Sequence, residues 1–270
     1  MALGRLRNLA SRRPLPFVVL LILGSLVVAG LAATLAVVLF GVDQTDPSLG
    51  LIGNLTATFC LVFLLWRFGW LEAAGIASWG GWRAWTAALV LLVYYLLELT
   101  YSFFGEFSFS VPAAAVSGLR VPGVIIGGMF EEVLFRGAVL YALVRVWGTT
   151  RTGVLRAASA SALLFGLVHS ANAIGGDRSE ILGQMGIALL EGIWWAAIVV
   201  RWGSLWPTVL IHVVSNWVLR TKALGLAGYH GTPRSYALAV LLGLPLAAWG
   251  VWYILRTDLE HQREGLTSHE

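Results

Sequence analysis

Long apolar runs separated by short polar stretches dominate the pattern along this chain. A membrane-spanning helix needs about 20 mostly apolar residues, and eight segments reach or approach that length. The fifth and seventh are short, which a bundle tolerates where neighbouring helices shield their ends. The pattern predicts an all-α fold, a polytopic transmembrane helical bundle of about eight spans. Their approximate limits are 16–41, 49–66, 84–104, 122–146, 156–171, 182–200, 205–219 and 236–255.

The composition agrees with a membrane protein. Of 270 residues, 58% are hydrophobic and 12% are charged, and the mean hydropathy is +0.80, whereas about a quarter of the residues in a soluble domain are charged. The single cysteine, Cys60, excludes a disulfide framework and a cysteine-based zinc site. A net charge of +4 would suggest a nucleic-acid partner in a soluble protein. Here the basic residues flank apolar segments, so we interpret them as topology signals and expect no nucleic-acid partner.

The basic residues also predict the orientation. A cytoplasmic N-terminus places 12 of them on the cytoplasmic side, 5 on the other side and Arg136 within a span. Because basic loops are retained in the cytoplasm, we expect both termini there, in a bacterial cell membrane. The first apolar run is longer than the core of a signal peptide, which favours an uncleaved helix. The 12 cytoplasmic residues are Arg5, Arg7, Arg12, Arg13, Arg67, Arg83, Arg145, Arg151, Arg156, Arg201, Arg256 and Arg263.

One membrane domain is expected to cover nearly the whole chain, without an internal repeat. Residues from about Leu71 to Arg83 and from Gly105 to Arg120 are predicted to be interfacial connectors, because Trp and Tyr favour the headgroup level. The predicted divisions are a basic cytoplasmic N-terminus (1–15), N-terminal transmembrane helices and connectors (16–120), a catalytic core (121–220), a loop with the last transmembrane helix (221–256), and a polar tail (257–270).

Ionisable side chains inside the predicted spans are the strongest functional signal. A charged group at bilayer depth is costly and is rarely kept there without a partner or a task. Residues four apart share a helix face, so Glu132 and Arg136 are expected to pair, while Glu131 projects about 100° away and is free for another partner. A pair that merely locks two helices together is the structural alternative.

Two later spans add His169, His212 and Asn216, the last two on one helix face. Each histidine alone could be an interhelical hydrogen-bond partner. Together with Glu131, they are the parts needed to activate a water molecule: a carboxylate base, an imidazole that shares the proton, and donors that hold an oxyanion. Glu98 and Glu191 lie in other spans, where they could line a water-accessible cavity or pair with a polar neighbour such as Gln184; structural pairing is the preferred interpretation.

Three motifs in order, Glu131-Glu132-x-x-x-Arg136, Phe165-x-x-x-His169 and His212-x-x-x-Asn216, resemble those of the CPBP family. This family comprises intramembrane proteases related to the type II CAAX prenyl endopeptidase and to bacterial Abi and bacteriocin-immunity proteins. The run Gly203-Ser-Leu-Trp leading to His212 strengthens the resemblance, which covers about residues 120–220.

The resemblance implies an intramembrane endopeptidase acting on a membrane-associated peptide or protein. It implies that Glu131 and His169 activate the attacking water, that His212 and Asn216 stabilise the oxyanion, and that Glu132 and Arg136 orient the site. Members have been described both as metalloproteases and as metal-independent glutamate proteases. Glu131, His169 and His212 could form a zinc set with one open position, but the helical His-Glu-x-x-His motif is absent, so we favour a metal-independent reaction.

Two rival functions remain. A membrane immunity factor or scaffold could keep the fold and use the polar cluster for binding alone. A proton-coupled transporter would also use intramembrane glutamate and histidine, but it predicts polar residues along a whole pathway and inverted repeats, and these residues are concentrated in one stretch.

Overall fold

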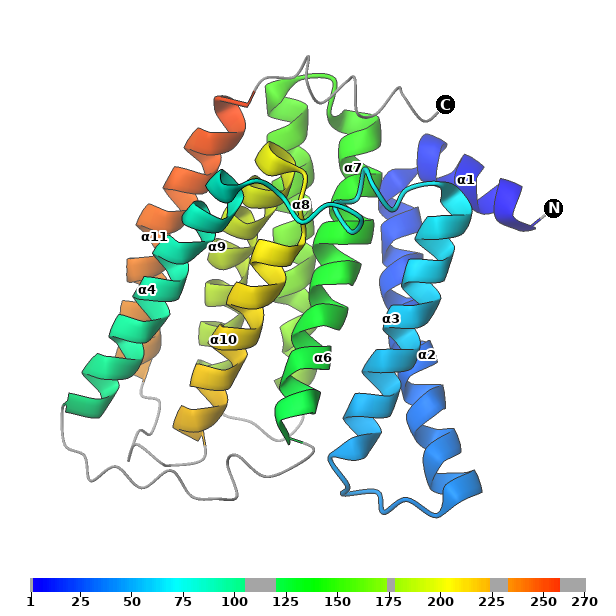
Figure 1. Cartoon of the computed structure of the whole chain (residues 1–270), viewed down its shortest axis with the longest axis horizontal. Helices are drawn as coiled ribbons and strands as arrows, with labels where there is room; N and C mark the ends of the chain where they lie inside the picture. The colour runs from blue at the N-terminus through cyan, green and yellow to red at the C-terminus, as the bar shows by residue number, and fades with distance from the viewer. Residues whose placement is uncertain (1, 105–119, 174–177, 224–232, 258–270) are drawn as a thin grey trace.

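In the computed structural model, the described residues are 2–104, 120–173, 178–223 and 233–257, and they form helices without strands (Figure 1). The predicted all-α membrane bundle is confirmed. The helices are α1 (Ala2–Arg12), α2 (Pro14–Phe40), α3 (Ser48–Phe68), α4 (Trp82–Phe104), α6 (Arg120–Glu132), the π-helix η1 (Val133–Val139), α7 (Leu140–Trp147), α8 (Arg151–Val168), the 3-10 helix η2 (His169–Ala173), α9 (Arg178–Trp202), α10 (Trp206–Ala223) and α11 (Pro233–Leu255).

Each of the eight predicted spans coincides with a helix or a run of consecutive helices. Within the described residues, four helical segments are long and apolar enough to cross a membrane: Pro14–Phe40, Ser48–Phe68, Arg151–Ala171 and Ile181–Trp202. Shorter apolar helices cover Trp82–Val93 and Ala239–Leu255. Membrane crossing by the other predicted spans, including α6 and α10, stays a prediction.

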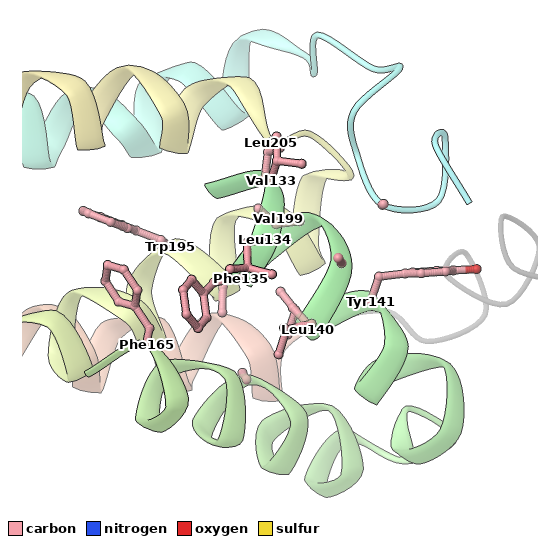
Figure 2. Packing of buried hydrophobic residues seen from close by; sticks show 14 of the residues in the cluster. Val133, Leu134, Phe135, Leu140, Tyr141, Phe165, Trp195, Val199 and Leu205 are labelled. Carbon is pink, nitrogen blue, oxygen red and sulfur yellow. The ribbon is translucent and has the colours of Figure 1, made fainter. Parts of the chain in front are cut away.

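Helices α6 to α10 form the centre of the bundle, with α2 and α3 paired on one side and α11 packed against α9 on the other (Figure 1). The core is rich in large side chains, and Figure 2 shows Phe135, Phe165 and Trp195 packed together in it. Many leucine, valine and phenylalanine side chains of α2 and α3 remain exposed. This pattern fits helices that face lipid instead of water.

The basic N-terminus forms a helix that the hydropathy pattern does not predict. Helix α1 lies across one end of α2 and α3 (Figure 1). Its buried Ala10 and partly buried Leu9 face the core, whereas its arginines are exposed. A short amphipathic helix of this kind is typical of the membrane interface. The hydropathy pattern does not indicate α1, because charged residues interrupt the hydrophobic positions of this helix.

The predicted span 122–146 is helical but not uniform, because it contains the π-helical segment η1. The carbonyl oxygen of Phe135 accepts hydrogen bonds from the backbone N–H of Leu140, five residues on, and from the hydroxyl of Ser161 on α8, at 2.8 Å. Segments of π-helix inside α-helices occur frequently at functional sites. Here the segment begins directly after the two glutamates.

The predicted connector at 71–83 packs against the start of α10. Leu205 donates its backbone N–H to Gly75 O at 2.9 Å, and the Ser204 hydroxyl donates to Ser78 O at 2.7 Å. The Trp206 indole donates to Ile76 O at 3.0 Å. These bonds fix the N-terminal end of the helix that carries His212. The second predicted connector, Gly105–Arg120, lies almost wholly outside the described residues, as do most of the loop before α11 and nearly all of the predicted polar tail.

We expect Gly80→Ala to destabilise this contact. Gly80 has φ +74°, and an added Cβ would lie 2.7 Å from Ser204 Cβ, so both the backbone and the packing become strained. The expected loss in the free energy of unfolding is about 1–3 kcal/mol, measured by thermal unfolding in detergent. Gly81→Ala is the matched control, because a Cβ there meets nothing within 4 Å. Equal stability of the two variants would contradict this account of the connector.

Candidate active site

The two adjacent glutamates at the end of α6 have different environments. Glu132 is completely buried, whereas the side chain of Glu131 is 32% exposed. Successive helix positions project about 100° apart, which separates the two carboxylates as the sequence predicts. Glu131 is therefore the carboxylate that water or a substrate can reach, and Glu132 belongs to the interior.

Glu132 joins two helices through one oxygen. Its Oε1 accepts a hydrogen bond from Arg136 Nη1 at 2.8 Å and one from His212 Nδ1, also at 2.8 Å. The predicted pairing of Glu132 with Arg136 is confirmed. The bond to His212 was not predicted, because 80 residues separate the two partners. A buried carboxylate between two donors is compensated where it would otherwise be costly.

Arg136 is 1% exposed and lies between aromatic rings. Its guanidinium carbon is 4.1 Å from the centre of the Phe165 ring and 4.7 Å from the Trp195 ring. Gly192 leaves room for the guanidinium of Arg136 beside α9, since a Cβ at Gly192 would lie 3.3 Å from Arg136 Nη2. Cation–π contacts are strongest where water is excluded. The arginine thus holds α8, α9 and the Glu132 carboxylate together.

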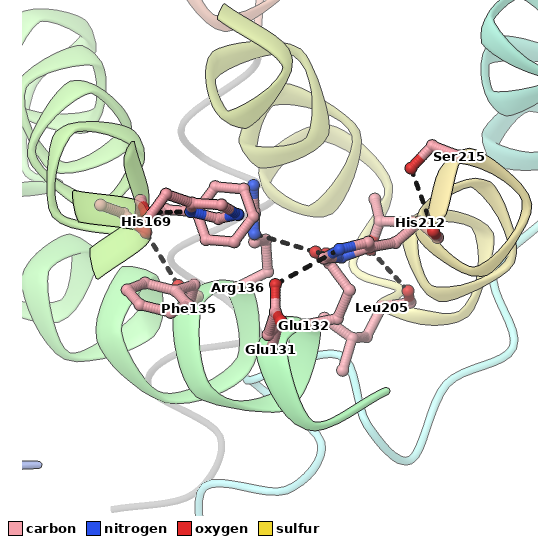
Figure 3. A network of polar contacts seen from close by, with 11 residues as sticks. Glu131, Glu132, Phe135, Arg136, His169, Leu205, His212 and Ser215 are labelled. Carbon is pink, nitrogen blue, oxygen red and sulfur yellow. Dashed lines mark hydrogen bonds and ion pairs between the residues drawn. The ribbon is translucent and has the colours of Figure 1, made fainter. Parts of the chain in front are cut away.

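His212 lies between the two carboxylates (Figure 3). Its Nδ1 is bound to Glu132, and its Nε2 is 3.4 Å from Glu131 Oε2. The first distance is that of a strong hydrogen bond, and the second is longer than a well-formed one. The ring is buried against Trp195, at a centroid distance of 4.7 Å. Glu132 therefore fixes the orientation of the imidazole, and Nε2 is the nitrogen that faces Glu131.

His169 is the first residue of η2, directly after the end of α8. Its Nδ1 is 2.9 Å from the carbonyl oxygen of Phe165. A carbonyl can only accept, so Nδ1 carries the proton and a neutral ring has an unprotonated Nε2. The Phe165 ring lies beside both histidines, 4.8 Å from His169 and 5.8 Å from His212 between ring centres. The two histidines thus approach the same aromatic side chain.

The structure brings Glu131, Glu132, Arg136 and His212 into direct polar contact and links His169 to them through Phe165. Asn216 is partly buried on α10, one turn after His212, which places it on the same helix face. The catalytic roles of these residues stay predictions.

The alternative zinc set does not fit this arrangement. Within the described ranges, no three His, Cys, Asp or Glu side chains are grouped closely enough to hold a metal ion. Glu131 and His212 approach each other, whereas His169 joins this group through the ring of Phe165. We therefore derive no chemical step through a metal.

The aromatic residues around the site were predictable only in part. Phe165 belongs to a recognised motif, but its contact with Arg136 was not predicted. Trp195 was missed entirely, because a tryptophan in an apolar helix carries no signal of its partners. Of the other intramembrane glutamates, Glu191 is partly buried on α9 and has an interaction partner. The side chain of Glu98 lies outside the part of the molecule that is described.

Comparison with known proteins identifies the central part of the chain. Residues 116–218 match the family model described as type II CAAX prenyl endopeptidase Rce1-like. This segment is Rce1-like. It runs from before α6 to α10 and contains every residue of the polar cluster. The predicted resemblance to the CPBP family is thereby confirmed for these residues.

The Rce1-like match supports an intramembrane protease at the level of the family, and thus a protein that is embedded in a membrane and acts on peptides. No curated protein and no solved structure matches the chain.

Proposed function

We propose that this protein is an intramembrane endopeptidase that hydrolyses a peptide bond with a water molecule activated by Glu131 and His169. The observation that carries the proposal is the pair of carboxylates on either side of His212, one buried and one accessible. This arrangement separates a group that can react from a group that holds the site in place. The Rce1-like match supports peptide hydrolysis as the reaction class.

Glu131 is the proposed general base. Its carboxylate is accessible enough to receive a water molecule and lies beside the buried Glu132, Arg136 and His212. His169 supports this role, because the bond from Nδ1 to Phe165 O leaves Nε2 of a neutral ring able to accept a proton. The water oxygen attacks the peptide carbonyl carbon while its proton passes to Glu131, with His169 sharing that proton.

His212 and Asn216 are the proposed oxyanion donors. With Nδ1 donating to Glu132, a neutral His212 would have no proton at Nε2, whereas a protonated His212 donates from Nε2. In the proposed reacting state both ring nitrogens of His212 carry a proton, and the two glutamates flank the ring. The Nε2–H then donates to the oxygen of the tetrahedral intermediate, while the ring keeps the orientation that Glu132 gives it.

Collapse of the intermediate completes the reaction. The carbon–oxygen double bond re-forms, the carbon–nitrogen bond breaks, and the proton held by Glu131 and His169 passes to the leaving amine. Glu132 and Arg136 take no part in this transfer. Their proposed role is positioning, because Glu132 orients His212 and Arg136 compensates the charge of Glu132.

The proposed substrate is a membrane-associated peptide or protein, and the proposed location is a bacterial cell membrane with both termini in the cytoplasm. The exposed arginines of α1 support this orientation. The eight helical segments support a multi-pass topology in which the site lies among α6, α8 and α10.

The test is cleavage by the purified protein in proteoliposomes, using a panel of peptides with one membrane segment and a tag at each end. We expect the wild-type protein to cleave at least one peptide and His169→Ala to lose most of this activity, by about 10²–10⁴-fold. His169 is partly exposed, and thermal unfolding will verify that the variant is folded. If the folded variant cleaves at the wild-type rate, the proposed role of His169 is wrong. Binding of a peptide without any cleavage would favour the immunity or scaffold function.

A further inference from the structure

A second feature lies between α1, α2 and α3, away from the polar cluster. It is an apolar cavity of about 250 Å³. Ser25 in its wall donates its hydroxyl to Leu21 O of its own helix, at 2.7 Å, and so offers no donor to a ligand. Leu20 and Cys60 in the same wall are exposed. The cavity therefore opens toward the lipid-facing side of the bundle, and its residues include Leu6, Phe17, Leu20, Gly24, Cys60 and Leu64.

The helix that contributes Leu6 to this cavity is rich in arginine. Leu6 of α1 forms part of the wall, and it is flanked in sequence by Arg5 and Arg7. Arg7 donates to the carbonyl of Arg67, the penultimate residue of α3, at 3.0 Å. Arg12 and Arg13 follow at the end of α1, and no acidic residue precedes Asp43 in the sequence. The cavity wall thus includes one residue of an arginine-rich helix, and α1, α2 and α3 contain no acidic residue.

We propose that this cavity binds an anionic phospholipid, with an acyl chain between α2 and α3 and the phosphate at the arginines of α1. Guanidinium groups match phosphate oxygens in geometry, and basic residues at a membrane surface favour anionic lipids. The apolar wall cannot hold a polar ligand, and the arginines give a reason to prefer a negative headgroup. This inference does not depend on the proposed protease activity.

The test is lipid retention by the full-length protein, measured by native mass spectrometry after titration with phosphatidylglycerol or phosphatidylcholine of identical acyl chains. We expect wild-type protein to retain phosphatidylglycerol preferentially. Gly24→Leu should weaken retention about tenfold, because an added Cβ at Gly24 meets no protein atom within 4 Å and the longer side chain can occupy the cavity. Gly30→Leu is the matched control on the same helix, with equal free space but outside the cavity.

A second variant tests the headgroup. Arg5→Gln with Arg12→Gln should reduce phosphatidylglycerol retention about 30-fold and abolish the preference over phosphatidylcholine. Arg7 is kept because its bond to Arg67 O holds α1 against α3. Equal retention of the two lipids by wild-type protein would overturn the proposal. So would equal effects of Gly24→Leu and Gly30→Leu, or displacement of the lipid by inorganic phosphate alone, which would indicate a simple anion site.

Discussion

Replacing Glu131 with glutamine is expected to reduce peptide cleavage by about 10²–10⁴-fold, the range of general acid–base catalysis. The glutamine side chain has nearly the same shape, but its amide cannot accept the proton of the attacking water. Glu131 is 32% exposed and is 3.4 Å from His212 Nε2, so this substitution leaves the buried bond between Glu132 and Arg136 intact. The loss should therefore appear in the cleavage rate and hardly in the stability, measured with one peptide in proteoliposomes and by thermal unfolding in detergent.

Glu72→Gln is the matched control for this experiment. Glu72 is exposed and lies in the connector before α4, outside the polar cluster. The chemical change is the same, so we expect cleavage at the wild-type rate. If Glu131→Gln were as active as Glu72→Gln, Glu131 could not be the general base.

Arg136→Met is expected to lower the free energy of unfolding by about 3–5 kcal/mol and to reduce cleavage as well. Removing one partner of a buried ion pair leaves an uncompensated charge in the interior. Here the remaining charge is on Glu132, which is completely buried, and the variant also loses the contacts of Arg136 with Phe165 and Trp195. Unfolding in detergent measures the stability, and cleavage at a temperature where the variant is folded measures its effect on the site.

Two further variants separate charge from packing. Arg156→Met on α8 makes the same substitution at an exposed position and should change stability by less than about 0.5 kcal/mol. Adding Glu132→Gln to Arg136→Met removes the uncompensated carboxylate, so we expect the double variant to be more stable than Arg136→Met alone. If the losses in the free energy of unfolding caused by Arg136→Met and by Glu132→Gln simply add in the double variant, charge compensation is not the function of Arg136.

The hydropathy pattern was sufficient to place the helices, because a lipid-facing helix must be apolar over most of its length. It could not find α1, in which arginines interrupt the apolar positions, or the π-helical segment η1, which depends on contacts such as that between Ser161 and Phe135 O. The packing of the connector against the start of α10 could not be predicted either, because the hydrogen bonds between them join residues more than 120 positions apart.

The polar site was predictable where its geometry is local. The spacing of Glu132 and Arg136 within one helical segment predicted their bond, and the adjacency of Glu131 and Glu132 predicted their separation. The contacts of His212 with both glutamates and of Arg136 with Trp195 were not predictable, because they depend on how α10 and α9 pack against α6 and η1. Helix spacing alone does not determine which faces of different helices meet.

The central claim is that Glu131 and His169 deliver a water molecule to a peptide carbonyl without a metal ion. In the most direct test, purified protein is treated with a chelator and its metal content is measured. This protein then cleaves a membrane peptide in water enriched in oxygen-18, and the masses of the products are determined. We predict that protein without stoichiometric metal cleaves the peptide and that the new carboxylate contains one oxygen-18 atom. Stoichiometric zinc whose removal stops cleavage would contradict the claim.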